Sequence, residues 1–138
     1  MSVQLSVAAR NARLDAIETT AGTAAIIEVF TGAQPANCAA ADSGTKIASG
    51  TLPSDWLAAA SAGAKAKSGT WTITGLSAAS TGSNMGHFRV KDSGGSTTHI
   101  QGSITVTGGG GDMTVDNISI ANAQVATVNT FVLTDGNA

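Results

Sequence analysis

The sequence predicts an all-β protein, an antiparallel β-sandwich of jelly-roll type that carries one N-terminal α-helix. Three observations support this prediction. Short segments rich in Val, Ile, Thr and Phe recur along the chain, turns rich in small residues separate them, and helical spacing is convincing only near the N-terminus. We therefore expect a helical arm over residues 1–22 and a single β-sandwich domain over residues 23–138.

The N-terminal helix is predicted over residues 2–20. Gly22 follows as a C-terminal stop, and the apolar residues fall on one helical stripe: Val3, Val7, Leu14 and Ile17. A lone helix at the end of a β-rich chain either covers its own domain or reaches a neighbouring subunit. The sequence leaves both arrangements open.

The strands are predicted from period-2 alternation and β-branched content. They are expected at Thr23–Thr31, Lys46–Leu52, Gly69–Leu76, Gly86–Asp92, Ser96–Thr107, Met113–Ile120 and Val125–Thr134. The turn at residues 93–95 indicates a hairpin between two of these strands. Trp71 falls on the apolar face of its strand and is expected to anchor the core.

The connections between these strands differ in character. Gly32–Gly44 is longer than the usual connection of about 4–6 residues, which favours a contact surface or a lid. Pro53–Trp56 is expected to begin a short helix. Ser61–Ser68 is expected to be a solvated linker, with Lys65 and Lys67 facing water.

Four consecutive glycines, Gly108–Gly111, are expected to form a flexible tip between two long strands. Because ordering four glycines costs backbone entropy, an ordered tip would indicate that a partner surface holds it. Gly102 lies in the middle of the first strand and predicts a bend or bulge. A change of apolar parity predicts a second bulge near Asp116 or Asn117.

Residue spacing indicates no catalytic, cofactor-binding or metal-binding site. His87 and His99 are expected near each other on the polar face of the hairpin, without a third ligand at metal-binding spacing. Asp112 and Asp116 would lie about 13 Å apart on one strand, too far for the paired carboxylates of a glycosidase. Cys38 is the single cysteine and closes no internal disulfide. We expect no cofactor and no enzymatic activity.

Composition narrows the possible partners. The formal net charge is −2 and charged residues make up 12% of the chain, which argues against nucleic-acid binding because the phosphate backbone demands a basic face. No apolar segment has the length of a signal peptide core or a membrane span. We therefore expect a protein that is made in a cytoplasm and has no membrane partner.

Five segments of the sequence carry a resemblance when they are taken in order: Arg10–Ala25, Thr31–Thr45, Leu52–Gly63, Gly86–Gly95 and Thr107–Asn117. They resemble small virion structural proteins of tailed phages and prophages, and in particular the capsid decoration, or cement, type. This resemblance implies a jelly-roll domain without catalytic residues, bound outside the major capsid shell, commonly as a homodimer. It implies two partners, the phage major capsid protein and a second copy, and a place on the capsid exterior after assembly in the host cytoplasm.

The expected contact regions are the N-terminal helix, the loop over residues 31–45 and the glycine tip, together with one tryptophan beside a turn. Their candidate contact residues are Arg10, Arg13, Pro35, Asn37, Trp56, Gly108, Gly109, Gly110 and Gly111. Two other functions stay open: a tail, neck or glycan-binding receptor appendage, for which Trp56 is the one candidate aromatic, and a hydrolase, which the absent catalytic spacing disfavours.

Overall fold

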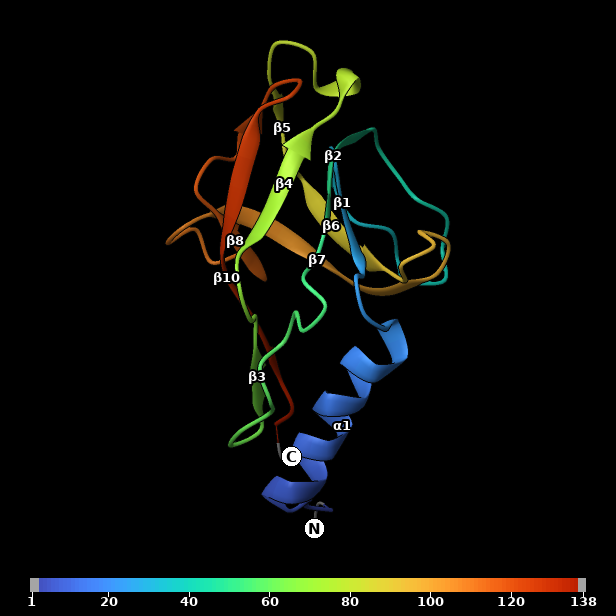
Figure 1. The fold of residues 1–138 in the computed structure, drawn as a ribbon, viewed down its shortest axis with the longest axis vertical. Helices are drawn as coiled ribbons and strands as arrows, with labels where there is room; N and C mark the ends of the chain where they lie inside the picture. The colour runs from blue at the N-terminus through green and yellow to red at the C-terminus, as the bar shows by residue number, and fades with distance from the viewer. Residues whose placement is uncertain (1–2, 137–138) are drawn as a thin grey trace.

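The computed structural model describes residues 3–136 and shows a β-barrel with an arm that projects from one end (Figure 1). Its elements are α1 (Val7–Ala21), β1 (Ile26–Phe30), β2 (Lys46–Thr51), β3 (Ala64–Ala66), β4 (Trp71–Gly75), the 3-10 turn η1 (Ser77–Ala79), β5 (Ser83–Asn84), β6 (His87–Lys91), β7 (Thr98–Val106), β8 (Met113–Val115), β9 (Ser119–Ile120) and β10 (Val125–Thr134).

The main sheet closes on itself. Its strands follow the order β10-β4-β2-β1-β6-β7-β8, and β8 pairs with β10 as well as with β7. The prediction of a mostly β chain with one N-terminal helix is confirmed, but the jelly-roll sandwich is wrong. Apolar and polar residues alternate in the same way along a strand of a sandwich and a strand of a barrel, so the pattern could not separate the two.

Aromatic side chains fill the barrel. The Trp71 ring lies 5.3 Å from that of Phe131, and the Phe131 ring meets Phe88 edge-on at 5.7 Å. Trp56 packs against Trp71 at 5.9 Å and donates its indole N–H to the carbonyl of Gly22. The prediction that Trp71 anchors the core is confirmed, because it is fully buried at the centre of this cluster.

The arm consists of α1, β3 and the end of β10, which runs on beyond the barrel to pair with β3 (Figure 1). Ser6 caps the start of α1 by accepting from the N–H of Ala9, and Gly22, at φ 84°, ends the helix by donating to the carbonyl of Glu18. The helix packs on its own chain, which is the first of the two arrangements that the sequence left open.

Two connections differ from their predictions. Pro53–Trp56 begins no helix, and Leu57 instead forms an isolated β-bridge with Lys67. The expected linker at 61–68 contains β3, and Lys65 in it is 3% exposed rather than solvated. In both places pairing with neighbouring strands overrides the local preference of an alanine-rich sequence.

The glycine tip does not join an antiparallel pair of strands. β7 and β8 are parallel, with Ile104 opposite Met113 and Val106 opposite Val115, so the tip carries the chain back before β8 begins. The tip is held by its own chain: the N–H of Gly111 donates to Thr105 Oγ1, and Asp112 accepts from Ser103. Its order therefore needs no partner surface.

Neither predicted bulge lies where it was expected. Gly102 pairs in regular register with Phe88, and the shift between β6 and β7 falls between Val90 and Lys91. Gly102 is needed for space instead, because a Cβ there would lie 2.9 Å from the Phe88 ring and 3.0 Å from Asp112. The parity change before Ile118 marks the end of β8 at Val115, not a bulge.

Replacing Gly109 by alanine is expected to lower the free energy of unfolding by about 2 kcal/mol through overpacking. The added Cβ would lie 2.7 Å from the Cβ of Thr105 and 3.0 Å from the carbonyl oxygen of Val106. Urea unfolding followed by circular dichroism measures the change. Gly136→Ala is the matched control, since nothing lies within 4 Å of a Cβ at that position. Equal stability of the two variants would contradict this account of the tip.

Candidate functional site

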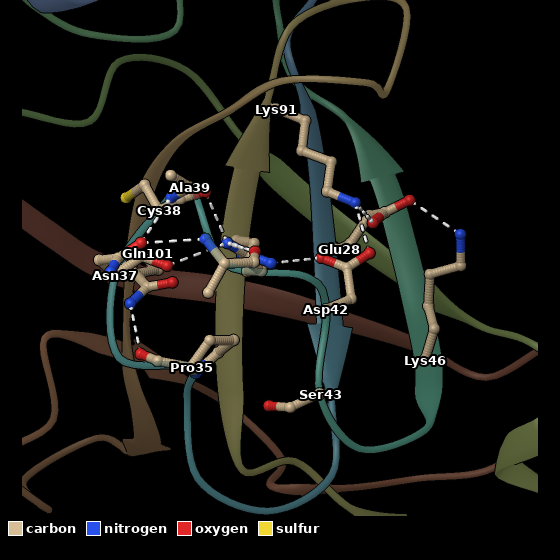
Figure 2. Close-up of polar contacts among 12 residues, drawn as sticks. Glu28, Pro35, Asn37, Cys38, Ala39, Asp42, Ser43, Lys46, Lys91 and Gln101 are labelled. Carbon is tan, nitrogen blue, oxygen red and sulfur yellow. Dashed lines mark hydrogen bonds and ion pairs between the residues drawn. The ribbon is translucent and has the colours of Figure 1, made fainter.

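The long loop between β1 and β2 is fastened over the outer face of the barrel (Figure 2). Arg89, on β6, donates to the carbonyls of Cys38 and Ala40 and forms an ion pair with Asp42. Gln101, on β7, donates to the carbonyl of Pro35 at 2.8 Å. The loop expected to be a contact surface or a lid is thus tied to two strands along its length.

Charges of alternating sign continue from this loop across the barrel. Lys91 Nζ lies 2.7 Å from Asp42 and 2.7 Å from Glu28, and Lys46 Nζ lies 2.8 Å from Glu28 (Figure 2). Burial would lower the pKa of Lys91, but hydrogen bonds to the two carboxylates outweigh it and the pKa is raised. Burial would raise the pKa of Asp42, but its hydrogen bonds to Lys91 and Arg89 outweigh this effect and the pKa is lowered. Lys91 and Asp42 therefore both stay charged near neutral pH.

The two histidines do not meet. His87 is opposite Ser103 in the pairing of β6 with β7, whereas His99 lies near the start of β7. His87 is 1% exposed, is stacked on Phe30 with ring centroids 5.2 Å apart, and makes a 2.9 Å hydrogen bond from Nδ1 to the carbonyl of Gly32. The prediction of solvent-facing neighbours is wrong, because the loop over residues 31–45 covers the outer face of β6.

The two carboxylates considered for hydrolysis, Asp112 and Asp116, each accept a hydrogen bond from a backbone N–H. Asp112 accepts from the N–H and the hydroxyl of Ser103, and these bonds lower its pKa. Asp116 accepts from the N–H of Thr127. Within residues 3–136, no three residues of the His, Cys, Asp and Glu types are placed to hold a metal ion. No helix in that range has the length and apolarity to cross a membrane.

The candidate contact residues fall into separate regions. Arg10 donates to the carbonyl of Asp135 at 2.9 Å, and Arg13 Nε lies 3.3 Å from Asp135 Oδ2, so both bind the end of β10 to α1. Pro35 and Asn37 lie in the fastened loop, where the carbonyl of Asn37 faces Arg89 at 3.4 Å.

The remaining candidates lie elsewhere. Gly108, Gly109 and Gly110 are exposed at the tip after β7, and Gly111 is half-buried. Trp56 is fully buried and has no surface for a partner. The structure therefore does not gather the candidates into one site.

The sequence reading missed the residues that organise these surfaces. Alternation along the predicted strand Gly86–Asp92 places Arg89 and Lys91 on its polar face and indicates no partner for them, and Lys65 is expected in a solvated linker. Lys65 Nζ contacts Asp15 at 2.8 Å and Glu18 at 3.1 Å, which joins β3 to α1. The sequence held one signal of this arrangement: Arg89 and Lys91 lie on a predicted strand of a chain that also has an unusually long loop, and basic side chains can hold such a loop by binding its carbonyls and carboxylates.

A hollow of about 530 Å³ lies beside the fastened loop, and Arg89 and Lys91 are among the residues that line it. Both cations already pair with acids of this chain, so the hollow offers no free charge. Comparisons with protein-family models, curated proteins and solved structures find no match to this chain.

Proposed function

We propose that the chain is a non-enzymatic structural protein of a tailed-phage virion that binds the outside of the major capsid shell and cements neighbouring capsomers. The observation that supports this most is the distribution of exposed apolar side chains. Val3, Val7, Val106, Val125 and Val132 are the large hydrophobic residues exposed in the described chain. Three of them, Val3, Val7 and Val132, belong to the arm or directly precede it.

The arm is suited to contact another subunit. It projects from the barrel (Figure 1), and Lys65 and Asp135 hold its elements together, so it is ordered before it binds. A pre-ordered surface loses less conformational entropy on binding. The hydrogen bonds and ion pairs of the fastened loop similarly fix the barrel surface beside it.

Cementing requires no tight single contact. A protein that binds the assembled shell and not free subunits stabilises that shell by mass action, and repeated contacts add through avidity. Val7, half-exposed at the start of α1, would supply one of these weak contacts.

A glycan-binding appendage receives less support. Exposed aromatic side chains are expected on a sugar-binding surface, because their apolar faces stack on sugar rings. The chain has two Trp, three Phe and no Tyr, and all five aromatic residues are buried.

The proposal is tested by adding the purified protein to capsid shells that lack it and counting bound copies by sedimentation and electron microscopy. We expect many copies distributed over capsomer boundaries. Val7→Asp should weaken binding at least about tenfold, equivalent to about 1.4 kcal/mol. Val106→Asp is the matched control, because Val106 is similarly exposed, at 43% against 48%, but lies on the barrel.

Two results would contradict this function: no binding of the unaltered protein to the shell, or a few copies confined to one vertex. Equal weakening by Val7→Asp and Val106→Asp would retain the function but remove the arm as its contact surface.

A further inference from the structure

The outer surface of the barrel has two unlike halves. One row of outward-facing residues crosses six strands from β7 to β10, and each residue pairs with the next: Gln101, Arg89, Glu28, Ser49, Thr74 and Val125. The first two bind the fastened loop, and Glu28 is 6% exposed among its ion pairs. Thr74 and Val125 are exposed, on strands β4 and β10 that lie side by side (Figure 1). One half is therefore covered by the chain itself and the other is open.

We call the open half the bare face. It is the outer side of β2, β4 and β10, with these residues: Ser49, Thr72, Thr74, Val125 and Thr127. The segments that build it, residues 47–52, 68–86 and 117–134, contain no Asp, Glu, Lys, Arg or His. Lys46 and Asp116 directly precede two of these segments and give the face a charged margin. A centre depleted of charge inside a polar rim is the composition of a protein–protein interface.

The hydroxyl groups of the bare face have no partner within their own chain. Among residues 3–136, none of its four Ser and Thr side chains makes a hydrogen bond. Hydroxyls beyond β10 are used internally instead: Thr105 accepts from the N–H of Gly111, and Thr114 bonds to Thr130. The hydroxyls of the bare face are therefore available to a surface that is placed against them.

A second copy of the chain suits this face electrostatically. A two-fold contact sets the same patch of each copy against the other, so a charge within the patch would meet charges of its own sign. Each chain has a formal net charge of −2, and two copies repel each other at long range. Contact through the bare face brings no charged group of one copy against a like group of the other.

The shape of the face also suits a second sheet. Its side chains are short and mostly β-branched, so few rotamers have to be ordered when a partner covers them. Val125, 56% exposed, supplies apolar area to the contact. Two β-sheets with side chains of this size pack face to face at a spacing of about 10 Å.

We propose that the bare face binds the bare face of a second copy, so that two barrels pack sheet on sheet as a homodimer. The arm projects from one end of the barrel and is not part of this contact (Figure 1). A dimer of this kind therefore keeps two arms free, which goes beyond the binding of one arm to a shell.

Sedimentation of the full chain tests the inference. We expect a dimer for the unaltered protein at about 100 µM, a concentration that detects even weak association. Thr74→Lys should raise the dissociation constant at least about tenfold, because it buries an ammonium group against its own copy. Val125→Lys should do the same from the neighbouring strand. Val106→Lys is the matched control, since Val106 is 43% exposed but lies at the end of β7, outside the bare face.

Both altered positions of the bare face are exposed, so the variants should fold, and circular dichroism checks this. Salt gives a second measurement. Because the contact holds no ion pair, its dissociation constant should change less than about threefold between about 50 mM and 500 mM sodium chloride. A dimer that dissociates as the salt concentration rises would contradict a contact through the bare face.

Cross-linking identifies the occupant of the face. In a Cys38→Ser background, Thr74→Cys is treated with a bismaleimide, and a cross-linked homodimer is expected. Val106→Cys in the same background should give none. The absence of product from Thr74→Cys, a dimer that survives both lysine variants, or a monomeric unaltered protein would overturn the inference.

These measurements use no capsid shells, so their failure is distinct from failure of the proposed function. A monomer that still coats shells overturns the dimer and leaves the cementing function intact. If that monomer loses shell binding in Thr74→Lys, the bare face belongs to the shell contact instead. A dimer that depends on the bare face but binds no shell retains the inference and contradicts the proposed function.

Discussion

Replacing Asp42 by alanine is expected to lower the free energy of unfolding by about 2 kcal/mol, less than the cost of breaking a fully buried ion pair, because the Asp42 side chain is 38% exposed. The change leaves Arg89 and Lys91, whose side chains are 1% and 8% exposed, without the acid that joins them. Lys91 retains Glu28 as a partner, which limits the loss. Urea unfolding measures the effect, and Asp55→Ala, a change of an exposed aspartate outside this loop, is the control.

The same variant should release the fastened loop. Protease digestion is expected to cut within residues 31–45 at a concentration that leaves the unaltered protein intact, because exposed and mobile segments are cleaved first. The cleavage rate of Asp42→Asn should lie between those of Asp42→Ala and the unaltered protein, since asparagine keeps the shape of the side chain and loses its charge. Unchanged stability together with unchanged cleavage in Asp42→Ala would show that the carbonyl contacts of Arg89 hold the loop alone.

Protonation of Asp42 at low pH should weaken the same ion pairs. The folded-state pKa of Asp42 is lowered from its usual 3.8, so the stability that it contributes is present above that pH and is lost as the pH falls through the lower, folded value. The unaltered protein should therefore lose stability below about pH 4, and Asp42→Asn should lose less over that range.

Replacing Lys65 by alanine is expected to cost about 3 kcal/mol, because it removes charge-assisted hydrogen bonds and a buried aliphatic stem together. Lys65 Nζ binds Asp15, Glu18 and the carbonyl of Ala58, and it connects β3 to α1. The helix should then separate from the arm more readily. Amide hydrogen exchange measures this, with faster exchange expected in residues 7–21 and little change in β1 and β6.

Lys67→Ala is the matched control, because Lys67 is two residues away, its side-chain Nζ donates to the nearby carbonyl of Gly69, and within the described residues it forms no ion pair with α1. Faster exchange throughout the barrel in Lys65→Ala would contradict a role confined to the arm. Equal exchange in the two variants would show that Arg10 and Arg13 suffice to hold the helix.

The hairpin of β6 and β7 illustrates what local sequence can predict. Its alternation and its turn at residues 93–95 identified both strands, which pair antiparallel as expected. The helix end at Gly22 was also predictable, because a glycine with positive φ is a local feature.

Closure of the barrel and burial of the charged residues were not predictable in this way. Whether β8 pairs with β10 depends on contacts between segments distant in sequence, which no local pattern records. Lys65 looked like a loop lysine because Asp15 and Glu18, its partners, lie in a helix some fifty residues earlier. His87 and Arg89 looked solvent-facing because the loop that covers them belongs to another part of the chain.

The ten-residue strand β10 has a mechanical consequence. It is one continuous strand that pairs with β4 and β8 in the barrel and with β3 in the arm. Its ladder hydrogen bonds lie perpendicular to the strand, so tension along the arm loads them together in shear and does not open them one at a time. A pull on the arm is therefore resisted by the wall of the barrel itself.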